Sequence, residues 1–202
     1  MDEIRVGLGF DVHPFVKPPL ANANPTTYDL SDIGYKDQAK TSQYDAVEEA
    51  RIVEGSDFTE KANCLVLGGV RFQGTSPLVG HSDADVLAHA VCDAILGAAG
   101  MGDIGMMFPD DDDRFYNADS LWLLSEVTSK IAREGWVLVN ADCSVITEEP
   151  KLSPFRDEMI KKLSEVAKGP VHVKATRPEK LGALGRQEGI ACFAVALIRR
   201  DR

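Results

Sequence analysis

Three side chains with the chemistry of metal ligands are spaced so that one strand and one helix could present them together. Asp11 and His13 lie two positions apart near the end of an expected strand, where alternation places both side chains on one face. His89 lies on an expected helix. One carboxylate and two imidazoles suit zinc and leave a fourth position for substrate or water. Alternatively, His89 is a satisfied core histidine and Asp11 a turn residue, because spacing alone does not show that strand and helix meet.

Other polar residues lie around the start of that helix. Asp85, one turn before His89, is placed to accept a hydrogen bond from the imidazole and to fix its tautomer. His81 and Ser82 stand where a helix presents free backbone N–H groups, which favour a phosphate group. Ser82, followed three residues later by an acid, also resembles a capping box, so plain capping is the alternative for this serine.

Two loops carry further groups suited to an anionic ligand. Residues 101–113 contain two glycines and a run of acids, which suits sugar hydroxyls or a divalent ion. A solvated acidic turn explains the same composition. The loop before the last expected strand contains Thr176, Arg177, Glu179, Lys180 and Arg186. Cations and a hydroxyl beside one carboxylate suit a diphosphate with bridging Mg²⁺, and an exposed charged loop is the alternative.

The elements that must position these residues follow from hydrophobic periodicity and from turn and cap signals. Strands are expected over residues 3–10, 65–72, 136–147, 171–176 and 189–199, and helices over 83–96, 120–134 and 153–169. The third helix is expected to begin at Ser153 and Pro154, which suit an N-cap and a first turn. This order predicts an α+β fold, a single domain over residues 1–202 with a mixed sheet and helices packed on one face.

One segment does not fit a compact domain. Residues 17–63 are polar, and a loop of this length between two strands is uncommon. We interpret it as an inserted, partly disordered loop with a short helix near residues 43–53. Its composition favours a solvated excursion over a functional segment.

The composition limits the class of partner. The chain has 202 residues, 44% of them hydrophobic, which is enough for one domain with its own core. A net charge of −10 argues against nucleic acid or an anionic membrane surface, but it is compatible with a small phosphorylated ligand. Four cysteines without a C-x-x-C pair indicate free thiols in a reducing compartment. Neither a secretory signal nor a membrane-spanning run is evident, so we expect a cytoplasmic protein.

Five motifs in the sequence occur in the order typical of one protein family. They read G-F-D-V-H, H-S-D-A-D-V-L-A-H, G-D-I-G-x-x-F-P-D, P-K-L-S-P and K-A-T-x-x-E-K-L-G. Each motif is a weak signal alone. Together, at compatible spacings, they resemble the 2-C-methyl-D-erythritol 2,4-cyclodiphosphate synthase family over nearly the whole chain apart from the insertion.

The resemblance implies a homotrimer with active sites between neighbouring subunits. It implies that 4-diphosphocytidyl-2-C-methyl-D-erythritol 2-phosphate is converted to 2-C-methyl-D-erythritol 2,4-cyclodiphosphate with release of CMP. This is a phosphorus–oxygen lyase reaction of non-mevalonate isoprenoid biosynthesis. The substrate's 2-phosphate is the nucleophile, so catalysis reduces to aligning two anionic groups and neutralising charge. The implied cofactors are one Zn²⁺ per subunit and a Mg²⁺ or Mn²⁺ ion that bridges the substrate diphosphate.

The resemblance also assigns roles to individual positions. The implied metal ligands are Asp11, His13 and His89 for zinc and Glu179 for the second ion. The implied catalytic residues are His81, which positions the 2-phosphate together with Ser82, and Arg177. The implied contacts to methylerythritol are Asp103, Ile104, Gly105, Phe108, Pro109, Asp110, Asp111 and Asp112. The implied contacts to cytidine are Thr147, Pro150, Lys151, Leu152 and Ser153, while Thr176 and Arg186 face phosphates.

Three sites depart from the family's pattern. Ala84 stands where glycine is usual, and we expect little effect if the backbone there is helical. Arg177 and Pro178 replace a threonine that steadies the reacting phosphate and another polar residue. Arg177 either takes over that role by its charge or points away. Ala183 replaces an aromatic residue, so part of the nucleotide contact is lost or rebuilt.

Two other functions are compatible with these residues. A metal-dependent phosphoesterase would use the same ligands with water as the nucleophile, and it would release phosphate without cyclisation. A non-catalytic trimeric ligand-binding protein of the same fold is the second alternative. The departures at Arg177 and Ala183 favour it, whereas the presence of all four implied metal ligands argues against it.

Overall fold

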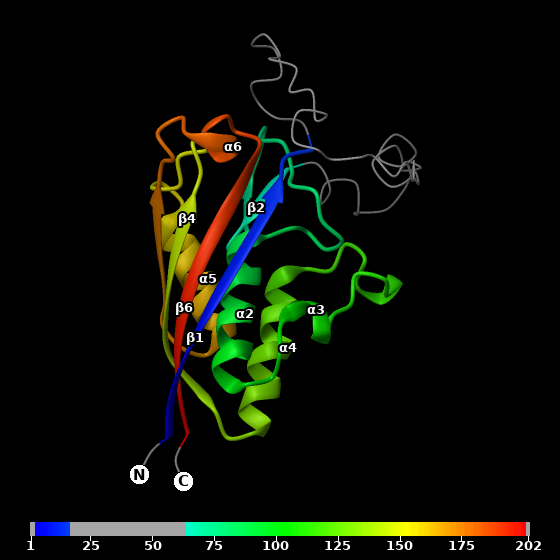
Figure 1. The fold of residues 1–202 in the computed structure, drawn as a ribbon, viewed down its shortest axis with the longest axis vertical. Helices are drawn as coiled ribbons and strands as arrows, with labels where there is room; N and C mark the ends of the chain where they lie inside the picture. The colour runs from blue at the N-terminus through cyan, green and yellow to red at the C-terminus, as the bar shows by residue number, and fades with distance from the viewer. Residues whose placement is uncertain (1–2, 17–63, 201–202) are drawn as a thin grey trace, which may run out of the picture.

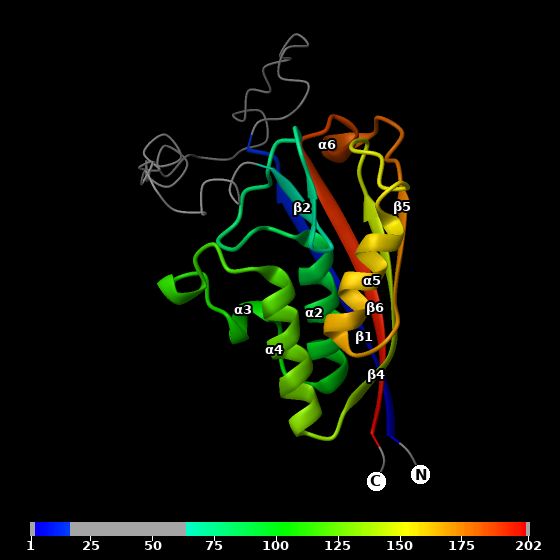
Figure 2. The same cartoon turned by 180° about the vertical axis from the view of Figure 1, so that it is seen from behind.

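The computed structural model of the protein describes residues 3–16 and 64–200, which form a sheet with helices on one face (Figures 1 and 2). The strands of this sheet are β1 (Glu3–Pro14), β4 (Val137–Ile146), β5 (Val171–Thr176) and β6 (Gly189–Arg200), in the order β1-β6-β4-β5. The β4–β5 pair is parallel and the other pairs are antiparallel. The predicted mixed sheet with helices on one face is confirmed. The predicted insertion over residues 17–63 lies outside the described residues.

Three long helices lie on the inner side of the sheet, two of them against it and the third on top of these two. They are α2 (Val86–Ala99), α4 (Ser120–Arg133) and α5 (Arg156–Ala167). Helix α2 lies against β1 and β6, α4 packs on α2, and α5 packs on β5. Because α2 is enclosed between the sheet and α4, nearly all of its side chains are buried. The short elements are α3 (Ile104–Met107), the 3₁₀ turn η3 (Asp113–Phe115) and α6 (Gly182–Gly185). None of the helices in the described part of the chain is both long and apolar enough to cross a membrane.

The inner face of β1 carries small and polar residues, which allows α2 to approach the sheet closely. A Cβ atom at Gly9 would lie only 1.9 Å from the carbonyl oxygen of Ala90, and Gly7 is similarly constrained by the same helix. The alternation that turns these glycines inward also turns Asp11 and His13 inward. The close contact between β1 and α2 therefore sets how near the two polar side chains come to the helix.

The outer face of β1 and β6 is apolar and exposed. Its large side chains are Ile4, Val6, Leu8, Phe10, Val12, Phe193 and Val195. The rings of Phe10 and Phe193 pack together with their centroids 4.6 Å apart. Within residues 3–16 and 64–200, no helix covers this face (Figures 1 and 2).

The segment predicted as one strand over residues 65–72 is a hairpin. It consists of β2 (Leu65–Leu67) and β3 (Val70–Phe72), which pair in antiparallel fashion. Gly68 and Gly69 form the turn between them with φ angles of 56° and 71°. A two-residue turn with positive φ at both positions favours glycine, so the Gly–Gly pair separates two strands and the prediction of one strand is wrong.

Two helices begin later than predicted. Helix α2 begins at Val86, with Asp85 rather than Ser82 as its N-cap. Helix α5 begins at Arg156, and the predicted cap Ser153 lies in the turn before it. That turn is closed by a hydrogen bond from the Phe155 N–H to the Leu152 carbonyl oxygen, so the chain turns once before the helix starts.

Candidate functional site

Asp11, His13 and His89 come together where the end of β1 meets α2. The Oδ2 atom of Asp11 lies 3.0 Å from Nδ1 of His89 and 3.2 Å from Nε2 of His13. The three ligand atoms all lie within 4.8 Å of one another, and the described residues contain no other such group of three. The strand and the helix, whose meeting the sequence left open, thus present these side chains together.

Hydrogen bonds on the far side of each imidazole leave the near nitrogen with a lone pair. Nδ1 of His13 donates to the Val79 carbonyl oxygen at 2.6 Å, so in the neutral ring Nε2 faces Asp11 without a proton. Nε2 of His89 lies 2.8 Å from the hydroxyl oxygen of Ser120, on the side away from the cluster. A metal ion needs neutral imidazoles whose near nitrogens are free, and this arrangement supplies them.

The electrostatics of the cluster favour a cation at its centre. Burial alone would raise the pKa of Asp11, but the hydrogen bonds that its carboxylate accepts from the rings of His13 and His89, when these carry a proton on the near nitrogen, lower it overall. Burial alone would lower the pKa of His89, but the hydrogen bond to Asp11 and nearby carboxylates raise it. Two ligands of one tetrahedral zinc ion lie about 3.3 Å apart, given metal–ligand bonds of about 2.0–2.1 Å. The separations of 3.0 and 3.2 Å are close to that value, so the donor set fits zinc.

Asp85, predicted to hold the His89 imidazole, has a different role. Its buried carboxylate accepts hydrogen bonds from the backbone N–H groups of Leu87 and Ala88, at 3.1 Å each, and so caps α2. It also accepts from the two glycine N–H groups of the β2–β3 turn, at 2.9 and 2.8 Å. Four backbone donors saturate this carboxylate, and the prediction that it fixes the His89 tautomer is wrong.

His81 and Ser82 lie in the loop before α2. The Ser82 hydroxyl oxygen lies 3.1 Å from Nε2 of His89 and does not cap the helix. Nε2 of His81 donates to the Asp112 carbonyl oxygen at 3.2 Å, and its ring meets that of Tyr116 edge-on. The predicted position at the helix N-terminus is therefore wrong, and of the two side chains Ser82 contacts a ring of the cluster, whereas His81 contacts Asp112 and Tyr116.

The residues predicted to contact methylerythritol surround α3 and η3. Asp103 caps α3, and the ring of Phe108 packs edge-on against that of Phe115. Asp112 pairs with Arg114, and that hydrogen bond lowers the pKa of Asp112 to about 2. The remaining members of this group, which are half-buried or exposed, are Ile104, Gly105, Pro109, Asp110 and Asp111. These side chains stay accessible to a ligand.

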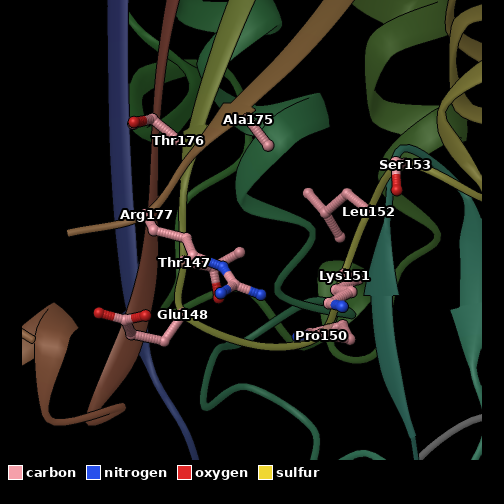
Figure 3. A pocket seen from close by; sticks show the side chains of 9 residues that line it. All are labelled: Thr147, Glu148, Pro150, Lys151, Leu152, Ser153, Ala175, Thr176 and Arg177. Carbon is pink, nitrogen blue, oxygen red and sulfur yellow. The ribbon is translucent and has the colours of Figure 1, made fainter. Parts of the chain in front are cut away.

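The residues predicted to bind cytidine line a single pocket of about 370 Å³ (Figure 3). The lining residues are Thr147, Glu148, Pro150, Lys151, Leu152, Ser153, Ala175, Thr176 and Arg177. The pocket lies between the loop after β4 and the end of β5. Thr147 Oγ1 donates to the Glu149 carbonyl oxygen at 2.5 Å, which tightens that loop. A pocket of this volume is large enough for a small organic ligand.

The cluster lies at the end of β1 and the pocket at the ends of β4 and β5, and these strand ends lie at the same end of the sheet (Figure 1). The directions of pairing bring the carboxyl ends of β1, β4 and β5 to that end. Strands β6 and β4 separate β1 from β5, which places the edge strands about 14 Å apart. Within one chain, the residues of the cluster therefore do not line the pocket, and two strands lie between them.

Comparison with known proteins decides the family. Residues 50–199 match the YgbB family. The 2-C-methyl-D-erythritol 2,4-cyclodiphosphate synthase of Geobacillus thermodenitrificans is 49% identical over 156 residues, which cover 75% of this chain and 98% of that protein. The chain belongs to the 2-C-methyl-D-erythritol 2,4-cyclodiphosphate synthase family. The resemblance seen in the five motifs is thus confirmed.

Two solved structures share the fold of this synthase-family chain. The bifunctional IspDF from Campylobacter jejuni is 34% identical, with a TM-score of 0.74, and the match covers 100% of this chain and 43% of that protein. The IspF of Plasmodium falciparum, solved as a CDP complex, is 28% identical with a TM-score of 0.67. That match covers 98% of this chain and 97% of the Plasmodium protein.

The positions that depart from the synthase-family pattern have distinct surroundings. Ala84 is buried with a φ of 55°, so the backbone there is left-handed and the expected helical conformation is wrong. The side chain of Arg177 points into the pocket, with Nη2 3.6 Å from a carboxylate oxygen of Glu149 (Figure 3). Ala183 is exposed on α6, and the loss of nucleotide contact there stays a prediction.

Glu179 and Arg186, predicted at the second metal ion and at phosphates, lie on either side of α6. Glu179 is exposed and has a φ of 54°. Nε of Arg186 donates to Glu188 at 2.6 Å. Among the residues that the structure describes, no group of three metal-ligating side chains includes Glu179, so the second metal site stays a prediction.

Sequence reasoning missed Ser120, which is fully buried and lies against His89. The sequence does indicate that Ser120 is buried, because it shares one face of its helix with the apolar residues Leu124 and Val127. A polar residue within an apolar stripe needs a buried partner. The Val79 carbonyl group was also missed, and a backbone acceptor leaves no signal in residue type.

Proposed function

We propose that this protein converts 4-diphosphocytidyl-2-C-methyl-D-erythritol 2-phosphate to 2-C-methyl-D-erythritol 2,4-cyclodiphosphate and releases CMP. The observation that carries the proposal is the cluster of Asp11, His13 and His89, whose lone pairs converge in a member of the synthase family. In this phosphorus–oxygen lyase reaction, the 2-phosphate oxygen bonds to the β-phosphorus while the bond from that phosphorus to CMP breaks. We place the reaction in the cytoplasm because the four cysteines are free and buried.

The residues around the cluster have separate tasks in this proposal. Asp11, His13 and His89 would hold Zn²⁺ as a carboxylate and two neutral imidazoles. When bound, zinc supplies a Lewis acid for a phosphoryl oxygen. His81 and Ser82 would orient the 2-phosphate through their N–H and O–H groups, and the contact of Ser82 with the His89 ring supports its part in this.

The pocket at β4 and β5 is the proposed site for the nucleotide. Thr147 and Lys151 line it and offer a hydroxyl and a cationic donor, and its volume suits a small ligand. The Plasmodium falciparum relative was solved as a CDP complex, which supports a cytidine nucleotide here. Thr176 and Arg177 line the same pocket and face the phosphates. The proposed carboxylate for the bridging Mg²⁺ or Mn²⁺ is the exposed Glu179.

A homotrimer completes the proposed site. In one chain the cluster and the pocket lie toward opposite edges of the sheet, so a neighbouring subunit would bring its pocket to this chain's cluster. The exposed apolar face of β1 and β6 supports this assembly, because a large apolar surface is stabilised when a partner covers it. The trimer would thus supply both cover for that face and an active site at each interface.

Product analysis by mass spectrometry tests the proposed reaction. The protein is incubated with the cytidine diphosphate substrate, Zn²⁺ and Mg²⁺, and we expect equal amounts of CMP and the cyclic diphosphate. Release of inorganic phosphate with the cytidine diphosphate group intact would instead identify the phosphoesterase. Intact substrate bound to a zinc-loaded protein would identify a ligand-binding protein and contradict the proposed reaction.

A further inference from the structure

We infer that Ser120 and Asp83 form a hydrogen-bonded relay that fixes the tautomer of His89 and so positions its Nδ1 as a metal ligand. The inference rests on the metal site of the proposed function, and it assigns a positioning role to two residues outside the ligand set. Ser120 begins α4, and Asp83 lies in the loop before α2, so the relay also joins two elements behind the site.

The relay starts at the buried side of the His89 ring. Nε2 lies 2.8 Å from the hydroxyl oxygen of Ser120, whose residue is fully buried. The Ser120 hydroxyl in turn makes a short hydrogen bond to one carboxylate oxygen of Asp83. The other carboxylate oxygen accepts the Ser120 backbone N–H at 3.1 Å. Serine and carboxylate are therefore joined by two hydrogen bonds that hold the hydroxyl in one orientation.

The direction of each proton follows from the chemistry of the groups. An ionised carboxylate only accepts hydrogen bonds, so the single proton of the Ser120 hydroxyl goes to Asp83. The hydroxyl oxygen then presents a lone pair to His89 at 2.8 Å, and Nε2 must carry a hydrogen to avoid facing it with another lone pair. A neutral imidazole has one such hydrogen, so a ring held by the relay keeps Nδ1, the nitrogen beside Asp11, as the one that would bind zinc.

The second hydroxyl near the ring does not make this selection. Ser82 lies 3.1 Å from Nε2 of His89, but it is only partly buried, and among the residues that the structure describes no carboxylate accepts a hydrogen bond from it. Its hydroxyl can rotate to donate to a bare nitrogen or to accept from an N–H group. The other imidazole, His13, is fixed by the backbone carbonyl group of Val79. The two rings thus present opposite nitrogens to the cluster, each selected by the acceptor behind it.

Zinc affinity of the full-length protein tests the relay directly. Competition with a chromogenic chelator, without substrate, measures zinc binding in the wild type and in Ser120→Ala and Asp83→Asn. We expect each substitution to weaken zinc binding by about 10- to 100-fold, the range typical for residues that orient a metal ligand. The matched control is Thr128→Val, which removes another buried hydroxyl of α4 that bonds only the Leu124 carbonyl oxygen. It should leave zinc affinity unchanged.

Nitrogen-15 NMR of labelled histidine shows which ring nitrogen of His89 carries the proton. A substitution that only destabilised the fold would not change this distribution. In zinc-free wild type, at a pH where the ring is neutral, the relay and Asp11 compete for the ring proton of His89, so Nε2 should carry it in a larger fraction of molecules than in Ser120→Ala. In Ser120→Ala the proton should shift toward Nδ1, where Asp11 accepts it. The relay is overturned if Ser120→Ala keeps zinc affinity within about threefold, keeps the Nε2 proton, or weakens zinc no more than the Thr128→Val control.

The outcome is separable from that of the proposed reaction, because neither readout involves turnover. A protein that binds zinc through this relay but forms no cyclic product would overturn the proposed function and leave the relay standing. If the protein forms the cyclic product but Ser120→Ala and Asp83→Asn bind zinc normally, the proposed function stands and the relay is overturned. Asp83→Asn keeps the test decisive if Ser120→Ala fails to fold.

Discussion

At the residue scale, the cluster of Asp11, His13 and His89 explains how a chain with a net charge of −10 can bind an anionic substrate. Its own atoms form a cation site. Each neutral imidazole holds its single proton on the far nitrogen, at the Val79 carbonyl group or the Ser120 hydroxyl, so the near nitrogen can offer a lone pair to a cation. The field that a phosphate meets is then set by a bound ion and by local donors rather than by the total charge.

Arg177 gives a prediction at the same scale. Its side chain points into the pocket and is about half exposed, so it can leave Glu149 and pair with a phosphate group. We expect Arg177→Ala to lower kcat/KM about tenfold, the effect of losing one charge-assisted hydrogen bond. Steady-state kinetics of CMP release measures this, with Arg133→Ala at the exposed end of α4 as the matched control. An unchanged kcat/KM would show that Arg177 has no part in the reaction.

At the element scale, the position of the cluster depends on how closely α2 approaches β1. Gly9→Ala would place a methyl group 1.9 Å from the Ala90 carbonyl oxygen, inside van der Waals contact with a rigid helix. We expect it to lower the free energy of unfolding by about 3 kcal/mol through overpacking, and to weaken zinc binding as His89 moves.

Gly97→Ala is the matched control for Gly9→Ala. It lies near the C-terminal end of α2, is exposed, and its Cβ atom would lie 3.9 Å from the Leu8 carbonyl oxygen. It should raise the free energy of unfolding by about 0.5–1 kcal/mol through helix propensity. Urea unfolding measures the free energy of unfolding of both variants. Equal values for Gly9→Ala and Gly97→Ala would contradict the close packing of α2 on β1.

The caps of α2 and α4 allow a second prediction at this scale. Asp85 is fully buried and accepts from four backbone N–H groups, whereas Asp119 caps α4 in an exposed position. We expect Asp85→Ala to cost at least about 3 kcal/mol of unfolding free energy, because buried donors lose their acceptor. Asp119→Ala should cost about 1 kcal/mol, the usual value for an exposed cap. Thermal unfolding measures both, and similar losses would mean that the β2–β3 turn does not depend on Asp85.

The sequence predicted those features that depend on local periodicity. Alternation placed Asp11 and His13 on one face, and helical spacing placed His89 on a helix. It failed where a side chain has a distant partner. Ser82 and Asp85 both suit an N-cap, and only the fold turns the first toward His89 and gives the second to α2 and the glycine turn. The Ser120 contact joins residues 31 positions apart, so no local spacing predicts it.

At the scale of the whole molecule, the exposed apolar face of the sheet leads to a prediction about assembly. Val195 lies on that face and is 46% exposed in the single chain. We expect Val195→Glu to convert the proposed trimer to folded monomers, because burying an unpaired carboxylate at the proposed interface is costly. CMP release should be lost with the trimer, since the cluster and the pocket would no longer meet. The control is His172→Glu, at an exposed position of β5.

Native mass spectrometry and circular dichroism measure assembly and folding in these two variants. A Val195→Glu protein that stays trimeric would contradict the proposed interface. A folded monomer that still released CMP at the wild-type rate would contradict the proposed sharing of the site between subunits.

The most direct test of the central claim, zinc-dependent cyclisation at the cluster, is a phosphorus-31 NMR time course. Metal-stripped protein is given the cytidine diphosphate substrate and Mg²⁺, and Zn²⁺ is then restored, with His89→Ala and the exposed His172→Ala compared in parallel. We predict that paired cyclic-diphosphate resonances and CMP appear only after zinc is restored, in the wild type and His172→Ala but not in His89→Ala. Cyclisation without zinc, equal turnover by His89→Ala, or inorganic phosphate in place of the cyclic product would contradict the account.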